Sequence, residues 1–452
     1  MLTTVLTVSL TASPAMPRVL LFTRTTGFRH ACIEPAVEAL QAVAAGKWHV
    51  RQTEDPTTFT SGGLGGIDVV VFLNTSGDVL DPSQQRALEA WLEQGGGWVG
   101  IHAAADTERD WPWYGELLGG AWFESHPRIQ PATITVTEAS HPTLRHVPEA
   151  WSRTDEWYNY TRSPGPHAHV LALLDEDSYE GGTMGADHPI VWTVPMGQGV
   201  GFYTGLGHTR ESWSEPAFLQ HVTAAIDWAA SGGWVTLASL DDRTWAHRNG
   251  WRSGTGAVGA GPGITAEPGT GVLLNTAVGR PGDLVSRADF GDCEVSLEFM
   301  VPEGGNSGVY LQGRYEVQIL DSAGKTQPGP GDCGGIYERW DETRSPSGFE
   351  GTPPSTNAAK PAGTWQRYEI VFRAPRFGPD GLKTENARFE RITHNGVVIH
   401  ENVELTGPTR GGWGAEAGEG PIRLQGDHGP IAYRNIRVRR LPPTGSGGAC
   451  TP

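Results

Sequence analysis

The chain has 452 residues, which is enough for two or three domains of ordinary size. Its 17 Trp and 10 Tyr exclude an intrinsically disordered chain, because such chains lack the large apolar side chains that build a core. The formal net charge of −17 argues against nucleic acid or an anionic membrane surface as the partner, and no apolar run reaches the roughly 20 residues that a membrane-spanning helix needs.

The first 16 residues are treated separately from the fold. They carry a short apolar stretch and the small residues Ala12-Ser13-Pro14-Ala15, as at the end of a signal peptide, but lack its basic start. A signal-peptide remnant and a true start at Met16 both explain this segment. We expect a secreted bacterial protein in the first case and a cytoplasmic one in the second.

Strands and helices alternate from residue 17 onward. Strands are predicted at Arg18–Thr23, His49–Thr53, Asp68–Asn74 and Trp98–His102, and helices at Glu34–Ala44 and from Asp81-Pro82 to about Gln94. Later strands are predicted near Thr133–Thr137, Val170–Leu174, Ile190–Val194 and Val200–Thr204, with a helix from about Pro216 to Ala230. This order predicts an α/β domain over 17–231 with a mainly parallel sheet.

The pattern changes at Ser231-Gly232-Gly233, where the helices stop. Short alternating strands between Gly and Pro turns predict an all-β sandwich or jelly roll over 234–441, followed by a flexible tail over 442–452. Strands are predicted at Glu294–Phe299, Gly308–Gln312, Tyr315–Leu320, Arg367–Phe372, Phe389–Thr393, Ile422–Gln425 and Asn435–Arg439. Asn395-Gly396 predicts a tight hairpin turn.

The four cysteines show no CxxC spacing, so a zinc knuckle is not expected. Cys293 and Cys333 fall in the same domain and could form a disulfide if the protein is exported. Two buried free thiols are the equally plausible alternative.

Three histidines follow predicted strands of the first domain. The strands end near His30, His102 and His208, and ligands bind at the carboxyl ends of strands in open α/β sheets. Residues 1–232 also hold 11 of the 15 His and 26 Asp and Glu against 12 Lys and Arg. Imidazole with carboxylate suits Zn or Mn, and the same groups without metal suit acid–base catalysis. Scattered histidines on a solvated acidic surface are the alternative.

The first domain resembles the ThuA-like (trehalose utilisation) family, through the motifs GFRH, DVVVFLNTSGDVL, GGGWVGIHAAADT, DEWYNY, GADHPIVW and FYTGLGHT. The resemblance implies a flavodoxin-like fold related to class I glutamine amidotransferases and an activity on oxidised (keto) disaccharides. No Cys stands in Gly100–Ala103, where those enzymes carry their nucleophile, which argues against glutamine hydrolysis. The matching residues are interpreted as catalytic (His102, His208), sugar-binding (Asp106, Glu156, with neighbouring Trp157) and metal-binding (His30).

Polar side chains alternate with apolar ones along the predicted strands of the second domain. One face carries long amides, carboxylates and aromatics, which suit hydroxyl-rich ligands: Glu294, Ser296, Glu298, Tyr310, Gln312, Glu316, Gln318, Arg423 and Gln425, followed by His428. This composition predicts a concave sugar-binding face, and a merely solvated face is the alternative.

The second domain resembles the 3-keto-disaccharide hydrolases, also described as keto-glycoside lyases, through GGNSGVYLQGRYEVQILDS, GGIYER, NAAKPAGTWQRYEI and IRLQGDHGPIAYRNIRVRRL. The resemblance implies a concanavalin-like jelly roll. The pattern positions are Glu298, Asn306, Gln318, Asp321, Tyr337, Lys360, Gln425 and His428. Gly378–Arg388 departs from the family as an insertion.

A ketone at C3 of a sugar acidifies the hydrogen on C2, so a base can remove that proton and the C1 oxygen can leave by elimination. We assign the base to His428 or Glu316, and enolate stabilisation to Lys360 or to a divalent metal held by Glu298 and Asp321. Tyr337 is the expected acid, and Asn306, Gln318 and Gln425 the expected substrate-binding side chains.

These assignments predict an enzyme that cleaves 3-keto-glycosides. No GxGxxG follows a strand, so no nicotinamide is expected, and a separate sugar dehydrogenase must supply the oxidised substrate. Two alternatives stay open. The β-domain is a non-catalytic carbohydrate-binding module attached to a ThuA-like enzyme, or the protein is an ordinary glycosidase with two carboxylates.

Overall fold

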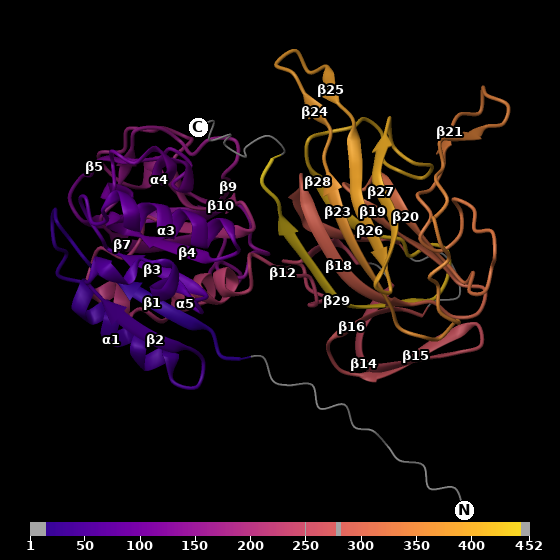
Figure 1. The fold of residues 1–452 in the computed structure, drawn as a ribbon, viewed down its shortest axis with the longest axis horizontal. Coiled ribbons are helices and arrows are strands. Elements are labelled where there is room, and N and C mark those ends of the chain that lie inside the picture. The colour runs from indigo at the N-terminus through magenta and orange to yellow at the C-terminus, as the bar shows by residue number, and fades with distance from the viewer. Residues whose placement is uncertain (1–14, 249, 277–281, 444–452) are drawn as a thin grey trace, which may run out of the picture.

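The computed structural model describes residues 15–248, 250–276 and 282–443. Most of the predicted signal-peptide remnant and of the predicted tail, together with Cys450, lies outside these residues. Figure 1 shows an α/β domain formed by the first half of the chain beside a β-domain formed by the second half. No helix in the described part is both long and apolar enough to cross a membrane.

The first domain is built on a nine-stranded mixed sheet. Its strands, in spatial order, are β2 (His49–Thr53), β1 (Arg18–Phe22), β3 (Val69–Leu73), β4 (Gly97–Ile101), β11 (Gly199–Thr204), β10 (Pro189–Met196), β9 (His169–Asp175), β6 (Gln130–Val136) and β7 (Ala150–Asp155). The pairs from β2 to β11 are parallel, and those from β11 to β7 are antiparallel. The prediction of a mainly parallel sheet therefore holds for only half of the sheet, from β2 to β11. In the other half, the two-residue turn Gly197-Gln198 joins β10 directly to β11, which requires antiparallel pairing of these two strands.

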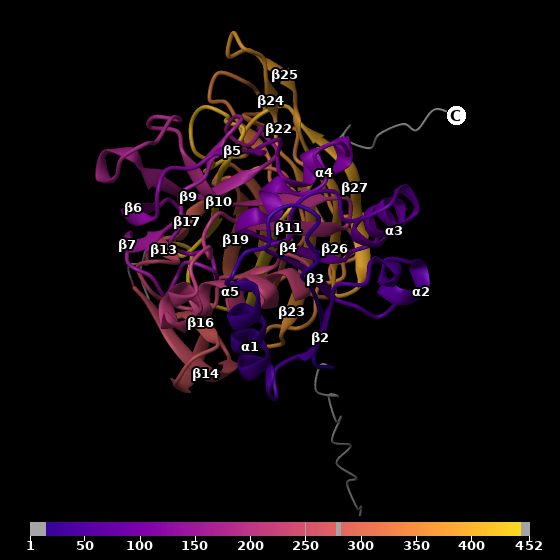
Figure 2. The same ribbon diagram turned by 90° about the vertical axis from the view of Figure 1, so that its left-hand side faces the viewer.

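Helices cover both faces of this sheet (Figure 2). On one side lie α1 (Ile33–Ala44) and α5 (Pro216–Ala230), and on the other α2 (Ser61–Leu64) and α3 (Pro82–Glu93). The predicted start of α3 is confirmed. The Asp81 carboxylate accepts hydrogen bonds from the backbone N–H groups of Ser83 and Gln84, and the Gln84 side chain accepts one from the Asp81 backbone N–H. The smaller elements are η1 (Pro56–Thr58), η2 (His102–Asp106), α4 (Pro112–Leu117), β5 (Phe123–Ser125) paired with β8 (Asn159–Tyr160), η3 (Glu176–Ser178) and η4 (Glu211–Ser214).

The second domain is the expected β-sandwich. One sheet contains β15 (Gly263–Pro268), β14 (Trp251–Ala260), β16 (Val272–Asn275), β29 (Ile431–Arg440), β18 (Cys293–Met300), β23 (Gln366–Arg373), β26 (Ala387–His394) and β27 (Val397–Leu405), with β12 (Val235–Thr236) paired to β29. The other contains β13 (Trp245–His247), β17 (Leu284–Phe290), β28 (Gly420–Leu424), β19 (Asn306–Leu311) and β20 (Tyr315–Leu320). Two small hairpins join β21 (Arg339–Trp340) to β22 (Gly348–Phe349) and β24 (Arg376–Phe377) to β25 (Lys383–Glu385).

Successive side chains of each strand point to opposite faces of its sheet, so every second side chain packs into the core of the sandwich. Leu297 and Phe299 of β18 and Val309 and Leu311 of β19 are fully buried in the core. The predicted Asn395-Gly396 turn joins β26 to β27, and both residues have positive φ, as a two-residue hairpin turn requires. The residues between those core positions face outward, and they include the predicted site residues.

The cysteines are reduced in the described residues. Cys32, Cys293 and Cys333 are all free and buried, so the alternative of a Cys293–Cys333 disulfide is wrong and the free thiols are correct. The Cys333 sulfur lies 3.2 Å from the hydroxyl of Tyr368.

The two domains share an apolar interface. Strand β12 follows α5 after four residues and pairs with β29. Trp228 of the first domain lies with Phe290 and Val438 of the second around one small cavity. Beside them Arg440 of β29 contacts Glu138 and His169 of the first domain.

Candidate functional sites

The first candidate site lies at the carboxyl ends of the parallel strands. His30, His102 and His208 follow β1, β4 and β11, and Glu156 follows β7. Among the described residues, these four are the group of His, Cys, Asp or Glu whose ligand atoms all lie within 4.8 Å of one another. The structure therefore brings together the three histidines that sequence reasoning placed at one sheet edge. We call these four residues the His–Glu centre.

His102 occupies a strained turn between β4 and η2. Its φ of 48° lies in the left-handed region, which is uncommon for a non-glycine residue and concentrates at functional sites. His102 lies within Gly100–Ala103, the segment in which the sequence comparison expected no nucleophilic Cys. The chain presents an imidazole there instead.

Glu156 lies between the imidazoles. Its Oε2 is 3.3 Å from His102 Nε2 and 3.0 Å from His208 Nδ1. Its Oε1 is 3.1 Å from Nδ1 of His126, a residue that follows β5. Burial alone would raise the pKa of Glu156, but hydrogen bonds from His102 and His208 hold it well below its ordinary value. Glu156 is therefore an anion at neutral pH.

The imidazole nitrogens at this centre converge on one another and on Glu156. His102 Nδ1 lies 2.8 Å from the carbonyl oxygen of Gly205, which only accepts, so Nδ1 carries a proton. The other ring nitrogen, Nε2, lies 3.3 Å from Glu156 Oε2 and 3.1 Å from His208 Nδ1. His30 is buried, its Nδ1 has no hydrogen-bond partner, and burial lowers its pKa to about 3, so it is neutral. A cation among these atoms would satisfy all of them, and three imidazoles with one carboxylate suit Zn²⁺.

A second layer of contacts fixes the loop that carries His208. Asp155 is fully buried, and its carboxylate accepts hydrogen bonds from the backbone N–H groups of Gly207 (2.8 Å) and His208 (3.1 Å). Arg153 lies 3.3 Å from the same carboxylate. These contacts hold His208 beside Glu156.

Two predicted sugar-binding residues of this domain are placed differently. Trp157 is fully buried and donates its indole N–H to the Gln130 carbonyl oxygen, so it belongs to the core and offers no surface to a sugar. Asp106 lies at the end of η2 and pairs with Arg109 at 2.8 Å. Tyr158, which adjoins Trp157 in the sequence, tilts its ring against His102 with centroids 3.9 Å apart. Sequence reasoning missed His126. His126 lies in a loop without periodicity, so nothing in the sequence pointed to it.

The second candidate site is the outer face of the five-stranded sheet, which we define by Tyr310, Glu316, Gln318, Arg423 and Gln425. Tyr310 pairs in register with both Glu316 and Arg423, and Gly308 pairs with Gln318. Since paired residues point to the same side of a sheet, these side chains form one polar surface. The sequence predicted this grouping from the alternation alone.

Glu316 is the most perturbed carboxyl of this outer face. It is 2% exposed, and its Oε1 occupies the space over Gly308, where a Cβ would lie only 2.1 Å away. Burial raises its pKa to about 8, against the opposing effects of a hydrogen bond with Tyr310 and the charge of Arg423. Glu316 is therefore largely protonated at neutral pH and lies beneath the surface that a ligand would touch.

Three further predicted residues, Tyr337, His428 and Asn306, lie beside the outer face, and Gln318 and Gln425 belong to it. Tyr337 donates its backbone N–H to the Glu316 carbonyl oxygen and stands opposite Glu316 in register. Gln425 Nε2 is 3.5 Å from the Tyr310 hydroxyl, and His428 is exposed and paired with Asp427. Asn306 begins β19, and its Oδ1 is buried without a partner. Gln318 accepts a hydrogen bond from the Ile319 backbone.

The structure does not bring the predicted metal pair together. Glu298 lies on the outside of the other sheet, where Arg434 (2.6 Å) and Asn435 (3.0 Å) bind its two oxygens. Asp321 follows β20 and accepts the Gly304 backbone N–H at 3.0 Å. Because these contacts already satisfy the carboxylates, the pair offers no metal site. Lys360, the expected enolate stabiliser, is exposed, and its backbone is tied to Gln366 of β23, away from the outer face.

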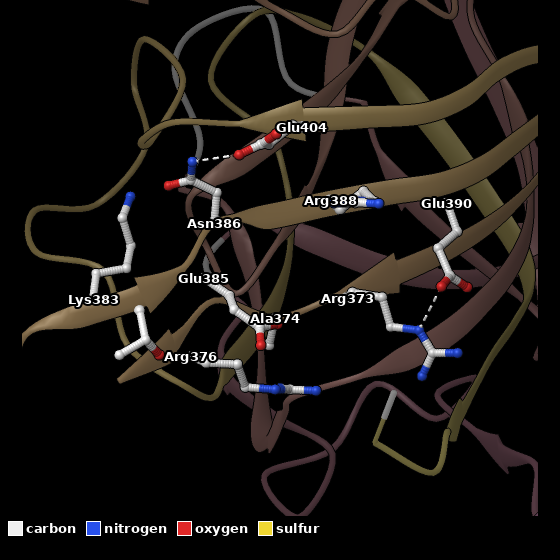
Figure 3. A pocket seen from close by; sticks show the side chains of 10 residues that line it. Arg373, Ala374, Arg376, Lys383, Glu385, Asn386, Arg388, Glu390 and Glu404 are labelled. Carbon is white, nitrogen blue, oxygen red and sulfur yellow. Dashed lines mark hydrogen bonds and ion pairs between the residues drawn. The ribbon is translucent and has the colours of Figure 1, made fainter. Parts of the chain in front are cut away.

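A polar cavity of about 510 Å³ lies at neither candidate site (Figure 3). It opens where the β24–β25 hairpin, part of the predicted insertion, adjoins β23 and β26. Its charges neutralise one another: Arg373 pairs with Asp292 and Glu390, and Lys383 with Glu416. We assign no ligand to it.

Two family models match the chain. The model described as Trehalose utilisation (ThuA) matches residues 18–229, and the model described as a 3-keto-alpha-glucoside-1,2-lyase-like domain matches residues 233–439. These matches confirm the expected architecture: the chain joins a ThuA domain to a 3-keto-disaccharide hydrolase domain. Both descriptions name carbohydrate chemistry. No curated protein matches the chain.

Solved structures resemble each domain separately. A protein from Bacteroides uniformis described as ThuA-like is 26% identical, with a TM-score of 0.42, and the match covers 48% of this chain and 93% of that protein. A ThuA-like protein from Parabacteroides merdae is 21% identical, with a TM-score of 0.42, coverage being 48% and 91%. A protein from Parabacteroides distasonis described as a glycosyl hydrolase is 26% identical, with a TM-score of 0.31, coverage being 44% and 83%.

Proposed function

We propose that this protein cleaves 3-keto-glycosides by removing the C2 proton and eliminating the C1 oxygen, after which water adds at C1. The observation that carries the proposal is the His–Glu centre, because it combines an anion, neutral imidazoles and an exposed neighbouring base at one edge of the sheet. The lyase-like description belongs to the model that matches the second domain, residues 233–439, so it supports this reaction class for the chain but not its placement at the His–Glu centre. A separate dehydrogenase would supply the oxidised substrate.

His126 is suited to take the proton from C2. Its Nδ1 lies 2.9 Å from the Pro127 carbonyl oxygen and 3.1 Å from Glu156, and both partners accept, so Nδ1 carries the proton and Nε2 has a free lone pair. The side chain is 42% exposed, so a substrate can reach that lone pair. The electrons of the C2–H bond form the enolate, which then expels the C1 oxygen with the second sugar or aglycone. The proton that His126 took from C2 passes to this leaving oxygen, so His126 is neutral again. Addition of one water completes a net hydrolysis.

A divalent cation held by His30, His102, His208 and Glu156 would supply positive charge for the enolate oxygen. Within the chain, Gly205 orients His102 and Asp155 orients His208, so the nitrogen atoms point inward before any ligand arrives. Titrating chelator-treated protein with Zn²⁺ tests this site without measuring activity. We expect one tightly bound ion in the wild type, its loss in His30→Ala, and no change in the exposed control His167→Ala. Equal Zn²⁺ binding by the wild type and both variants would mean that the His–Glu centre does not hold the ion.

The experiment that tests the function compares a 3-keto-disaccharide with its unmodified parent. Rapid release of free sugar from the oxidised form alone supports the proposal, whereas equal rates on both substrates contradict it. The variants His208→Ala and Glu316→Gln locate the reaction. We expect the first to lose activity and the second to keep it. The reverse result would move the chemistry to the β-sandwich.

A second role, sugar binding without catalysis, is favoured for the β-sandwich by one observation. Glu316 is 2% exposed, so a substrate carbon cannot approach its carboxyl in this structure. The side chains that reach the surface near it are suited to hydrogen bonding.

A further inference from the structure

An exposed indole lies against the turn between β19 and β20. Trp413 is 39% exposed, and its backbone N–H donates to the Gly313 carbonyl oxygen at 3.0 Å. Gly313 has a φ of 64°, and a Cβ there would lie 2.7 Å from the indole Cε3. The indole therefore packs directly on a glycine, which fixes the ring while part of it stays open to solvent.

A buried cation lies beside this indole. Arg423 is 6% exposed, and its guanidinium carbon is 3.7 Å from the Tyr310 ring centroid and 5.4 Å from that of Trp413. One of its nitrogen atoms donates to the Gly411 carbonyl oxygen at 2.7 Å, and another lies 3.4 Å from Asp283. Its Nε has no hydrogen-bond partner, which is costly for a buried donor.

We propose that Trp413, Asp283 and Gln425 form a saccharide-binding subsite, in which a pyranose ring stacks on the indole and the buried Arg423 holds the indole and the Asp283 carboxylate in place. The apolar C–H face of a sugar fits an aromatic plane, and its hydroxyl groups fit the carboxylate and the amide beside that plane. An apolar peptide segment would leave those polar groups without partners. The acidic Asp283 and Asp427 and the charge of −17 disfavour a nucleic acid. This subsite does not depend on the cleavage chemistry.

Binding of unreacted sugars tests the subsite. The full-length wild type is titrated with glucose disaccharides, trehalose among them, and with the 3-keto form of one, followed by calorimetry and tryptophan fluorescence. We expect Trp413→Ala to weaken binding at least tenfold and Trp413→Phe to retain part of it. The matched control is Trp340→Ala, because Trp340 is 41% exposed in the same domain and has Arg410 at 3.8 Å from its ring. That variant should bind like the wild type.

Three results would overturn the subsite: no binding of any of these sugars by the wild type, unchanged affinity in Trp413→Ala, or equal losses in Trp413→Ala and Trp340→Ala. Thermal unfolding of each variant shows that it is folded. Because the unmodified disaccharides undergo no cleavage in this account, a failure of the proposed enzymatic function would leave the binding result unaffected. The two claims therefore fail separately.

Discussion

His126 is the most solvent-exposed of the residues that contact Glu156 in this structure, at 42% against 20% for His208. If its Nε2 removes the C2 proton, His126→Ala should lower kcat on a 3-keto-disaccharide by ~10²–10⁴-fold, the usual contribution of a general base. KM and the bound metal should change little, because His126 is outside the four-residue centre. Steady-state kinetics and metal analysis measure these quantities.

The matched control is His428→Ala. His428 has nearly the same exposure, 43%, and a carboxylate partner, Asp427. The sequence predicted His428 or Glu316 as the base, and both lie outside the His–Glu centre. If His126→Ala kept the wild-type kcat and His428→Ala lost most of it, His428 and not His126 would be the general base.

The raised pKa of Glu316 predicts that the stability of the protein depends on pH. Burial raises its pKa to about 8 in the folded protein, whereas its ordinary value is 4.5. Between these values the unfolded chain has released this proton and the folded chain retains it, so stability falls as the pH rises from about 5 to 8, by at most ~5 kcal/mol. Glu316→Gln stays neutral and should lose less stability over that range. Urea unfolding of both proteins at pH 5 and pH 8 measures the difference, and equal losses would mean that Glu316 is ionised when folded.

At the residue scale, the sequence predicted correctly where a side chain lies when that residue follows the end of a strand. His30, His102 and His208 could be grouped because parallel strands bring their carboxyl ends to one edge. It failed for Trp157, since an aromatic side chain next to a carboxylate of a candidate site can equally well point into the core. It also missed His126, which approaches Glu156 through tertiary folding of a loop that has no pattern of its own.

At the element scale, the outer face depends on a glycine in β19. Gly308 leaves room for the Glu316 carboxyl, and a Cβ there would lie 2.1 Å from Oε1. Gly308→Ala should therefore displace that carboxyl and lower the stability of the protein by ~1–3 kcal/mol, the usual cost of overpacking. Chemical denaturation measures it. Gly418→Ala is the control, because a Cβ at Gly418 meets no atom within 4 Å. Equal stability of the two variants would mean that the carboxyl moves away without cost.

The elements themselves were predictable to different degrees. Continuous apolar runs such as β3 and the capped start of α3 identify their elements by composition alone. Strand direction is not encoded in that way, so the antiparallel pairing of β9 and β10 became visible only in the structure. Strand β7 alternates buried and exposed residues but was missed, because its buried positions are Trp151, Arg153 and Asp155, which form no apolar pattern in the sequence. The β24–β25 hairpin was detected only as an insertion.

At the scale of the whole molecule, Arg440 links the domains. It contacts His169 at 3.1 Å and Glu138 at 3.8 Å in the first domain, and Glu419 at 2.8 Å in the second. Arg440→Ala should lower stability by ~1–3 kcal/mol, because Glu138 is buried and loses a cation. Scanning calorimetry should also show the two domains unfolding at more separate temperatures. Arg388→Ala, at an exposed arginine on β26, serves as the control, and equal effects of the two substitutions would contradict the link.

If both proposals hold, the chain joins a reaction centre in its first domain to a sugar-binding surface in its second. Binding one ring of a disaccharide on the sandwich would raise the local concentration of oxidised glycoside near the first domain. The account as a whole nevertheless depends on a single chemical step, the removal of the hydrogen at C2 of a keto-sugar.

The most direct measurement of that step is turnover of a 3-keto-disaccharide in heavy water, with the released keto-sugar examined by NMR. If the C2 proton is removed before the C1–O bond breaks, deuterium should enter C2 of the product during enzymatic turnover and not in a sample without protein. His126→Ala should abolish both the incorporation and the cleavage. Rapid cleavage by the wild type with hydrogen retained at C2 would contradict the elimination mechanism and, with it, the role assigned to the His–Glu centre.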